Sequence, residues 1–392
     1  MDNIHSIGYS SLEHIRYLAD EIGPRPAGSE AEKLALDYAG EQLARYGYQP
    51  QWMDVPFAEP PKIEAGYLLA GLALAFCGLF WPFLPWISLL APLILVLVPE
   101  LEKINRRNVK KEQKSQNVSA VLEGKAEDPL VIFCAHVDTA RGMTLDHPWW
   151  VIIYAKGMSI MQRLAILIAL LSIVNLIGFQ IPQPATQAIQ LIVIIVGLVF
   201  MVAEVINQCF KGKDYSTGAI DNASGVGLVL ALAEYFAEFN PKRMQMAFLI
   251  TGAEEPGLYG AEAFAGQLNT KRKTLIVNLD MVGAGGQLQV VTKVGSLFTL
   301  GTCQVVNQLL FEILPQARGV WYSLKSGDFE PFLRMGFDAI SIQMAGNGAA
   351  ETGYHTIRDK TDLVDIQSLE TTASVMVQLI ETLPYSDWAI HK

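Results

Sequence analysis

Four long runs of apolar residues interrupt the polar pattern of the chain, and none of them contains a charged residue. The runs cover residues 65–81, 83–98, 164–181 and 188–203. Each run approaches the roughly 20 apolar residues with which a helix crosses a bilayer about 30 Å thick. Short turns join them into pairs, around Pro82 and across residues 182–187. The pattern predicts two inserted transmembrane hairpins, residues 65–99 and 161–208, and therefore four membrane-crossing helices.

Prolines in the first pair leave a second interpretation open. Pro82 and Pro85 lie at its turn, and Pro92 lies inside its second run, which is short for a membrane span. A buried core hairpin or a re-entrant pair would also fit these features.

Basic residues next to the hairpins predict their orientation in a membrane. The hairpin tips contain no Lys or Arg, whereas basic residues are frequent at the other end of each hairpin. They are Lys103, Arg106, Arg107, Lys110, Lys111, Lys114, Lys156, Arg163, Lys211 and Lys213. Because such residues stay on the cytoplasmic side, we expect a multi-pass integral membrane protein whose catalytic domain faces the cytoplasm.

Outside the apolar runs, strand and helix patterns alternate. Strands are predicted at 130–134, 244–251, 274–279 and 337–343, and helices at 225–236, 260–268, 299–314 and 367–383. Helical spacing also covers 10–48 on either side of a GPRPAGS turn, followed by an edge strand at 51–55 and a neighbouring strand at 116–124. The alternation predicts an α/β fold with a mixed, largely parallel sheet covered by helices on both faces.

The composition separates this chain from ordinary soluble proteins. Hydrophobic residues make up 51% and charged residues only 17%, against about 25% in a typical soluble domain. The net charge of −10 argues against nucleic acid as a partner, because phosphate binding needs a basic face. The four cysteines show no CxxC spacing, so neither a Cys-type zinc site nor a disulfide framework is predicted. The N-terminal segment does not resemble a secretory signal.

Acidic and imidazole side chains follow three of the predicted strands directly. His136 and Asp138 follow the first, Glu254 and Glu255 the second, and Asp280 the third. Ligands of such sheets bind beyond the carboxyl ends of the strands, so these residues are expected at one site. Adjacent glutamates in an apolar, glycine-rich turn are costly unless a cation is near. Taken alone, each of these residues has an ordinary alternative as a turn or capping residue.

Two further candidates lie outside the strand ends. Asp221 precedes the helix at 225–236 and would fit an N-cap, while His355 alone would fit an exposed loop histidine. Together with the strand-end residues, they bring carboxylate or imidazole groups from five segments. Carboxylate oxygen and histidine nitrogen form a ligand set that suits zinc, with manganese or cobalt as chemical alternatives.

The order of the motifs HxD, DNxSG, GAEExGLxG, NLDMVG and HTxxD resembles the M28 family of zinc peptidases, which includes bacterial aminopeptidases. The resemblance runs through the soluble part of the chain, from GPRPAGS to the C-terminal helix. It implies a zinc-exopeptidase-like fold and two Zn2+ ions. His136 and Asp280 would bind one ion, Glu255 and His355 the other, and Asp221 would bridge them.

The resemblance also implies roles in catalysis. Glu254 would be the general base, and Asp138 would orient His136 by accepting its second N–H. Asp328 would lie close to the metal ligands, and Tyr354 is a candidate hydrogen-bond donor to the oxyanion. The reaction would be hydrolysis of a peptide bond by a water that the two zinc ions activate.

The hairpins depart from the family pattern, as insertions into loops of one peptidase domain. This domain would comprise residues 1–64, 100–160 and 209–392. The second hairpin lies between His136 and Asp221, so we hypothesise that the mouth of the site faces the bilayer.

Three interpretations of the function follow. The first is a membrane-anchored aminopeptidase that acts on peptides. The second is a glutaminyl-cyclase-like or carboxypeptidase activity on the same scaffold; the cyclase branch typically works with one metal, and the full ligand set here favours two. The third is a non-catalytic membrane binding module, which the retained ligands and base disfavour. The sequence specifies neither the preferred substrate side chain nor the oligomeric state.

Overall fold

Two compact units make up the chain. The computed structural model describes residues 2–59, 65–81, 86, 89, 109–122, 124, 128–142, 148–177, 182–209, 214–241, 243–269, 272–295, 298–323, 325–346 and 352–390. The first unit comprises Met1–Glu59, Lys111–Gly142 and Lys213–Lys392, and the second comprises Pro60–Lys110 and Met143–Gly212. The division of the sequence into one peptidase domain with two inserted hairpins stays a prediction.

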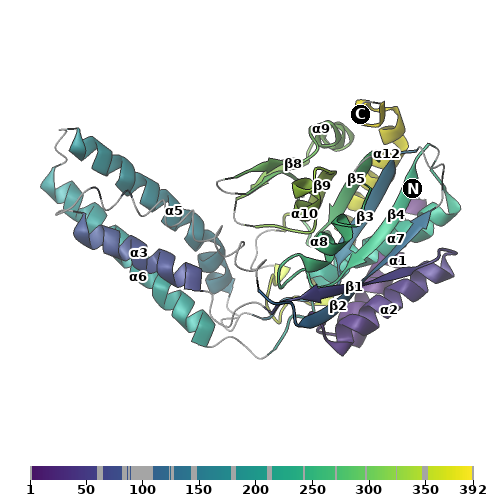
Figure 1. The fold of residues 1–392 in the computed structure, drawn as a ribbon, viewed down its shortest axis with the longest axis horizontal. Helices are drawn as coiled ribbons and strands as arrows, with labels where there is room; N and C mark the ends of the chain where they lie inside the picture. The colour runs from purple at the N-terminus through teal and green to yellow at the C-terminus, as the bar shows by residue number, and fades with distance from the viewer. Residues whose placement is uncertain are drawn as a thin grey trace. The chain divides into compact units, whose positions relative to one another are not determined.

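A nine-stranded sheet organises the first unit (Figure 1). Its strands are β1 (Gln51–Phe57), β2 (Gln113–Leu122), β3 (Leu130–His136), β4 (Gln245–Thr251), β5 (Thr274–Leu279), β6 (Leu288–Val294), β7 (Leu300–Gly301), β8 (Arg318–Tyr322) and β9 (Asp338–Met344). The order is β1-β2-β4-β3-β5-β9-β6-β7, and β8 pairs with β6. The prediction of a mixed sheet with β1 at its edge is therefore confirmed.

Parallel pairing is concentrated at the centre of this sheet. Strands β4, β3, β5 and β9 run parallel to their neighbours in that group, whereas β1–β2, β2–β4, β6–β9 and β6–β7 are antiparallel. Strands β6 and β8 also pair in parallel, so the sheet has as many parallel as antiparallel pairings among the described residues, and the expectation of a largely parallel sheet holds for its central strands. Every residue of β3 and β5 is buried, as expected for strands that are covered on both faces.

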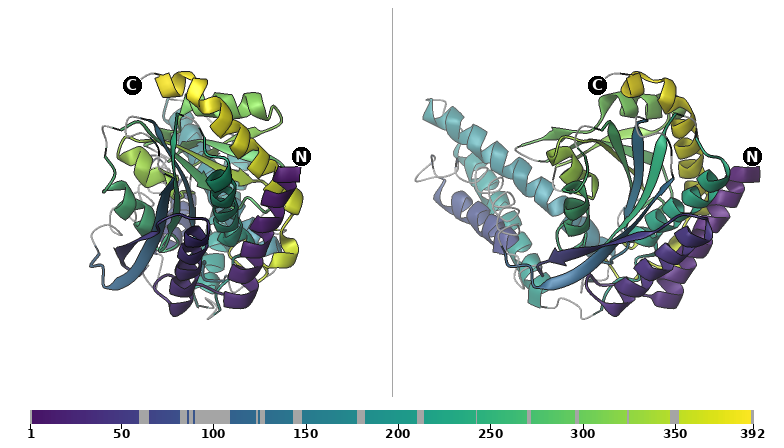
Figure 2. Two further views of the ribbon diagram at one scale, coloured as in Figure 1. Left: turned by 90° about the vertical axis from the view of Figure 1, so that its right-hand side faces the viewer. Right: turned by 45° about the vertical axis from the view of Figure 1, so that its right-hand side comes forward.

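Helices cover both faces of the sheet. They are α1 (Asp2–Arg16), a π-helical turn (Tyr17–Ile22), α2 (Glu30–Arg45), α7 (Ser224–Glu238), α8 (Tyr259–Ala265), α9 (Gln304–Ile313), α10 (Phe329–Arg334), α12 (Ile366–Thr382), α13 (Asp387–Ile390) and 3₁₀ turns at Thr361–Leu363 and Leu383–Tyr385. The segment Ala219–Ala223 before α7 is a loop, because Asp221 and Asn222 have non-helical backbone angles. In Figure 2 the purple helices α1 and α2 and the yellow α12 lie on one side of the sheet. Phe133 of β3 faces that side, while its neighbour Ile132 packs with α8 and α10 on the other.

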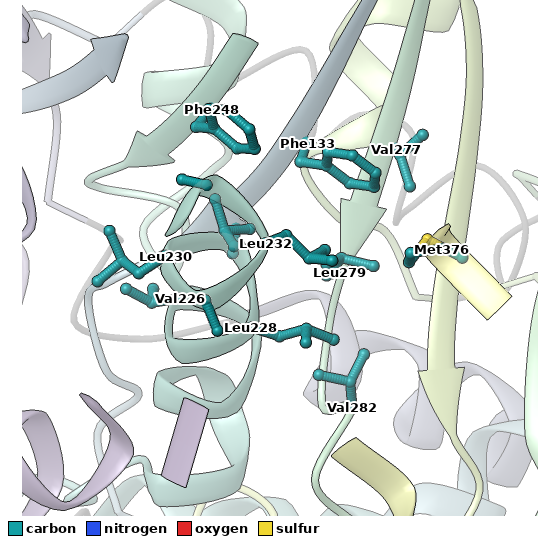
Figure 3. Packing of buried hydrophobic residues seen from close by; sticks show 14 of the residues in the cluster. Phe133, Val226, Leu228, Leu230, Leu232, Phe248, Val277, Leu279, Val282 and Met376 are labelled. Atoms are coloured by element: carbon teal, nitrogen blue, oxygen red, sulfur yellow. The ribbon is translucent and has the colours of Figure 1, made fainter. Parts of the chain in front are cut away.

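Helix α7 is apolar nearly all round because it lies between the sheet and α1. Its side chains Leu230 and Leu232 belong to one cluster with Phe133 and Phe248 of the central strands (Figure 3). A Cβ added at Gly225 would lie 2.3 Å from the Leu279 carbonyl oxygen. The first turn of α7 therefore lies directly against the end of β5.

The described residues of the second unit are mostly helical. It contains α3 (Ala65–Phe80), α5 (Pro148–Leu176) and α6 (Gln183–Cys209). Helix α3 packs closely along α6, since a Cβ added at Gly197 would lie 2.8 Å from the Gly71 carbonyl oxygen. Helix α5 begins within the range that the sequence predicted for the peptidase domain.

Within the described residues, one helical stretch, Gln183–Val202, is long and apolar enough to cross a membrane. The apolar stretches Gly71–Phe80 and Arg163–Leu176 are shorter. Most of the predicted run at 83–98 lies outside the described residues, as does the basic cluster at 103–107. Two hairpins with four crossings therefore stay a prediction.

Candidate metal centre

The candidate site lies at the carboxyl ends of three adjacent strands. His136 is the last residue of β3, and Asp280 follows β5 directly. Glu254 and Glu255 lie in the turn that follows β4. Because β3 pairs in parallel with both β4 and β5, these groups meet at one edge of the sheet, as the sequence predicted.

Asp221 reaches this edge from the loop before α7. The peptide bond between Asp221 and Asn222 is cis. The side-chain oxygen of Asn222 accepts hydrogen bonds from the Gly225 N–H at 3.0 Å and the Met281 N–H at 3.1 Å, and its amide donates to the Leu279 carbonyl at 2.9 Å. Asn222 thus fastens the loop that carries Asp221 to the end of β5.

His355 comes from the loop between β9 and α12. Its backbone has a positive φ of 53°, and the ring of Tyr354 stacks on the imidazole with centroids 3.9 Å apart. The Nε2 atom of His355 lies 3.3 Å from Asp221 Oδ2 and 3.5 Å from Glu255 Oε1.

Three overlapping groups of ligand atoms meet here. They are His136, Asp221 and Asp280; Asp221, Glu255 and His355; and His136, Glu254 and Glu255, with ligand atoms within 4.8 Å of one another in each group. Asp221 belongs to the first two groups, and its Oδ1 lies 3.3 Å from His136 Nε2. One carboxylate therefore lies between two histidines, with further carboxylates on either side.

This donor set fits a cation. Glu255 Oε1 is buried and has no hydrogen-bond partner among the described residues. Burial raises the pKa of Glu255, and the charges of Asp221 and Glu254 raise it further. Burial likewise raises the pKa of Asp280 to about 6, and Asp221 adds to this. Neighbouring carboxylates disfavour one another's ionised form, and a bound cation would stabilise that form. A ligand set of carboxylate oxygen and imidazole nitrogen suits zinc.

Two histidines offset the effect of burial on the pKa of Asp221. Burial by itself raises the pKa of this carboxyl, but hydrogen bonds from His136 and His355 outweigh it and hold the pKa below its usual range. The reverse holds for His136, where burial lowers the pKa but the charge of Glu254 and contacts with Asp138 and Asp221 raise it well above its usual value. The centre therefore favours an ionised Asp221.

Asp138 contacts both His136 and the turn that follows β4. The Nδ1 atom of His136 lies 3.1 Å from the Asp138 backbone carbonyl, which accepts its hydrogen bond, and 3.7 Å from the carboxylate. The carboxylate accepts the backbone N–H groups of Glu254 and Glu255, both at 3.0 Å. The Asp138 carboxylate therefore lies beside both the imidazole and the turn after β4, and its role in orienting His136 stays a prediction.

Side chains from three segments hold this turn, and sequence reasoning missed two of them. The Gly252 N–H donates to Asn117 at 3.1 Å, and the Ala253 N–H donates to Glu32 at 3.0 Å. With the two bonds to Asp138, four successive backbone N–H groups bind side-chain oxygens. Glu32 and Asn117 lie far from the motifs, so no local signal indicates them.

Asp359 holds the Asp221 loop in the same way. Its carboxylate accepts the Ile220 N–H at 2.7 Å and the Asp221 N–H at 2.9 Å. Burial raises the pKa of Asp359 to about 7 against these hydrogen bonds. Asp359 is the last residue of the HTxxD motif, so the sequence contained a signal for it that was not assigned.

The other two candidates also lie at this edge. Asp328 is buried and accepts a hydrogen bond from the Thr251 hydroxyl, while its Oδ1 atom has no partner among the described residues. Burial raises its pKa to about 6. Tyr354 is half-buried, and Lys325 Nζ lies 4.7 Å from the centre of its ring. Burial raises the pKa of Tyr354, and Asp221 and Glu255 raise it further.

Sequence comparison supports the resemblance seen in the motifs. Residues 205–380 match the profile of Peptidase family M28. A vacuolar membrane protease of Schizosaccharomyces pombe is 43% identical over 78 residues, which are 20% of this chain and 9% of that protein. Aminopeptidase YwaD of Bacillus subtilis is 27% identical over 182 residues, 44% of this chain and 39% of that protein. The chain thus spans less than half the length of these curated relatives.

Solved structures share the fold. The structure of BSAP, a zinc aminopeptidase from Bacillus subtilis, superposes with a TM-score of 0.55 at 16% identity, over 97% of this chain and 95% of that one. Tannerella forsythia glutaminyl cyclase gives a TM-score of 0.55 at 14% identity, over 96% of this chain and 98% of that one.

Proposed function

Because this chain matches Peptidase family M28 over residues 205–380, we propose that it is a membrane-anchored, zinc-dependent aminopeptidase. The observation that supports this most is the position of Asp221 between His136 and His355, at 3.3 Å from each. A carboxylate shared by two groups of possible ligands suits a site that holds two metal ions.

The ligand groups support a division between two zinc ions. His136 and Asp280 would hold one ion, Glu255 and His355 the other, and Asp221 would bridge them. Glu254 also lies within reach of His136, and we assign it to proton transfer because each ion already has three protein ligands without it. When bound, the ions would supply Lewis acidity at the scissile carbonyl and lower the pKa of the attacking water.

Proton transfer falls to Glu254. Its carboxylate accepts a proton from the water whose oxygen attacks the carbonyl carbon, and it delivers this proton to the amine nitrogen as the C–N bond breaks. Asp138 accepts the backbone N–H groups of both Glu254 and Glu255. These bonds fix the position of the proposed base relative to the proposed ligand beside it. We also propose that Tyr354, whose ring stacks on His355, donates a hydrogen bond to the oxyanion.

Membrane anchoring is supported by the apolar surface of the second unit. Helix α6 exposes Leu191, Ile195, Val199 and Val202 along its length, as expected of a helix surrounded by lipid. The vacuolar membrane protease named above is consistent with a membrane setting.

We propose that the peptidase unit lies on the cytoplasmic side of the membrane. A phosphatase fused at Lys392 should be inactive in cells and a fluorescent protein there should fluoresce; an active phosphatase would overturn this orientation.

Peptide cleavage tests the activity. Detergent-solubilised, zinc-loaded protein should release the first residue from peptides with a free N-terminus and leave N-acetylated copies intact. Peptides with an N-terminal glutamine separate the cyclase alternative, because cyclisation releases ammonia and keeps the chain length. Cleavage from the C-terminus would instead identify a carboxypeptidase, and no turnover on any of these peptides would favour the non-catalytic module.

A further inference from the structure

Arg25 is fully buried, which is rare for arginine, and the proposed mechanism does not use it. It lies in the GPRPAGS turn between the π-helical turn and α2. Burial lowers the pKa of Arg25 to about 10, and the charges of Asp359, Asp138 and Asp221 oppose this shift, so the side chain stays charged near neutral pH.

The guanidinium group binds backbone carbonyls from separate segments of the chain. Its Nε donates to Val137 at 2.9 Å, and its Nη2 donates to Gly218 at 3.1 Å. Its Nη1 donates to Thr217 at 2.7 Å, Leu18 at 2.8 Å and Gly23 at 2.7 Å. The planar shape of the group fixes the directions of these donors, which a lysine ammonium could not reproduce.

Two further hydrogen bonds join the backbone of Arg25 to Thr139 in the loop that follows His136, which is called the HxD loop below. The Arg25 N–H donates to the Thr139 hydroxyl at 2.9 Å, and the Thr139 N–H donates to the Arg25 carbonyl at 3.0 Å. Val137 and Thr139 flank Asp138, so Arg25 holds both neighbours of the residue that fixes the glutamate turn.

The other contacts of Arg25 lie just before Asp221. Thr217 and Gly218 lead into the loop that carries Asp221, and they lie against the HxD loop. A Cβ added at Gly218 would lie 2.5 Å from Thr139 Cγ2 and 2.4 Å from the Asp221 carbonyl oxygen. The two loops are therefore packed without free space, and Arg25 binds both of them.

We propose that Arg25 is a positioning residue for the metal centre. Its guanidinium group sets the spacing between the loop that follows His136 and the loop that carries Asp221, and so fixes the distance between two ligands of the same ion. The inference rests on the proposed zinc centre. It differs from a purely electrostatic role, in which a nearby cation would weaken zinc binding by repulsion.

Two substitutions separate geometry from charge. Arg25→Lys keeps the positive charge but loses the planar set of N–H donors. Arg25→Met loses both the charge and the donors. The zinc affinity of the full chain in detergent is measured by competition with a chromogenic chelator, with circular dichroism and the thermal midpoint of the metal-free protein recorded in parallel. Both variants should bind zinc about 10- to 100-fold more weakly than wild type, the range found when groups supporting metal ligands are lost. Exposed Arg16→Lys is the matched control and should bind zinc as wild type does.

Several outcomes would overturn the inference. Wild-type zinc affinity in folded Arg25→Lys, with tighter binding in Arg25→Met, would show that only charge matters. A lower thermal midpoint of the metal-free protein with unchanged zinc affinity would show a purely structural role. A wild-type protein that binds no zinc would refute the proposed function, and with it the centre that Arg25 is proposed to position.

If neither Arg25 variant folds, a pair of less disruptive substitutions at Thr139 tests the inference. Thr139→Val removes the acceptor of the Arg25 N–H, and Thr139→Ser keeps it. Thr139→Val should weaken zinc binding severalfold relative to Thr139→Ser. Equal affinities in these two variants would contradict the inference.

Discussion

Asp138 and Asp359 act on the metal centre through the backbone of the ligands. Each carboxylate accepts two successive N–H groups, from Glu254 and Glu255 in one case and from Ile220 and Asp221 in the other. Two hydrogen bonds from successive N–H groups to one side chain fix the backbone of each loop that carries a proposed ligand. Rigid loops lower the cost of bringing like charges together around a cation.

Replacing Asp138 by Asn should weaken the centre without removing a ligand. An Asn side chain offers one oxygen and one NH2 group, so one of the two backbone N–H groups loses its acceptor. We expect kcat/KM to fall about 10- to 100-fold, the range seen for groups that support metal ligands. The stability should fall by about 1–3 kcal/mol, the cost of a buried unpaired donor. Peptide hydrolysis and thermal unfolding measure the two effects.

Asp362→Asn is the matched control for this substitution, because Asp362 is exposed and the change should leave both quantities as in wild type. A kcat/KM of Asp138→Asn equal to that of the control would refute the role of Asp138.

Residue types at strand ends made the gathering of these side chains at one edge predictable, whereas the groups that hold them in place were not predictable. His136, Asp280 and the glutamate pair follow apolar strands, and a parallel arrangement brings such positions together. The supporting oxygens of Glu32 and Asn117 come from α2 and β2, and their partners are backbone N–H groups. A backbone donor leaves no mark in the sequence, so these pairings emerge only with the fold.

At the scale of elements, α1 and α2 are joined through a buried histidine. His14 Nδ1 lies 2.7 Å from the Tyr38 hydroxyl, and its Nε2 lies 3.0 Å from the Tyr46 hydroxyl. Burial lowers the pKa of His14 to about 4. Between that pH and about 6.5, the unfolded chain binds a proton on this residue and the folded chain does not. The stability therefore falls as the pH falls through this window.

The pH dependence of a His14→Gln variant tests this coupling. His14 should contribute a loss of up to roughly 3 kcal/mol between about pH 6.5 and pH 4 in wild type. The glutamine that replaces His14 does not titrate, while all other titrating groups are shared, so the thermal midpoint of the variant should fall less than that of wild type between pH 7 and pH 5. Parallel falls in the two proteins would mean that His14 is protonated in the folded state.

The junction of α7 and β5 places Asp221, and glycine at position 225 makes it possible. A Cβ there would lie 2.3 Å from the Leu279 carbonyl and 2.5 Å from Asn222 Oδ1. Gly225→Ala should therefore cost about 1–3 kcal/mol and weaken zinc binding, as measured by thermal unfolding and chelator competition. At Gly301 an added Cβ meets nothing within 4 Å, so Gly301→Ala is a control that should leave zinc affinity unchanged. Equal zinc affinities in the two variants would contradict this account.

The elements that the sequence indicated are those with strong apolar patterns. Strands β3, β4, β5 and β9 and helices α7 and α12 lie where the pattern predicted them. Strands β6 and β8 were not predicted. The short β8 has exposed or half-buried residues except its last, and its pairing with β6 depends on a partner that is distant in sequence. The predicted helix at 299–314 begins later, as α9, because Leu300–Gly301 pairs with β6.

At the scale of the whole molecule, the proposed catalytic residues all belong to the first unit. The second unit is held by close packing of α3 on α6, where Gly71 and Gly197 let the two backbones approach. The runs at 65–81, 164–181 and 188–203 fall largely within α3, α5 and α6, and composition alone was sufficient to indicate them. The depth and direction that the sequence predicts for them in a membrane would depend on lipid and flanking charges rather than on contacts within the chain.

Gly197→Leu tests whether catalysis depends on the packing of this helix pair. The added side chain would collide with the Gly71 carbonyl and the Ala75 backbone, both 2.8 Å from its Cβ. We expect a lower yield of dispersed protein in detergent and a lower midpoint of thermal aggregation. The kcat of the protein that remains folded, measured on soluble peptides, should stay within about twofold of wild type, because the proposed ligands and base all belong to the first unit.

The exposed neighbour Leu198 gives a control, because Leu198→Ile should change neither quantity. A kcat of Gly197→Leu that falls with its aggregation midpoint would show that the helices act on the site.

The most direct test of the central claim is the turnover of zinc-loaded Glu254→Gln beside zinc-loaded wild type. Gln keeps the size of the side chain but cannot accept the proton of the attacking water. We predict equal zinc contents, about two ions per chain, and a kcat on free N-terminal peptides that is lower by about 10²- to 10⁴-fold in the variant. Equal turnover at equal zinc content would contradict the account, because the hydrolysis would then proceed without Glu254 as its base.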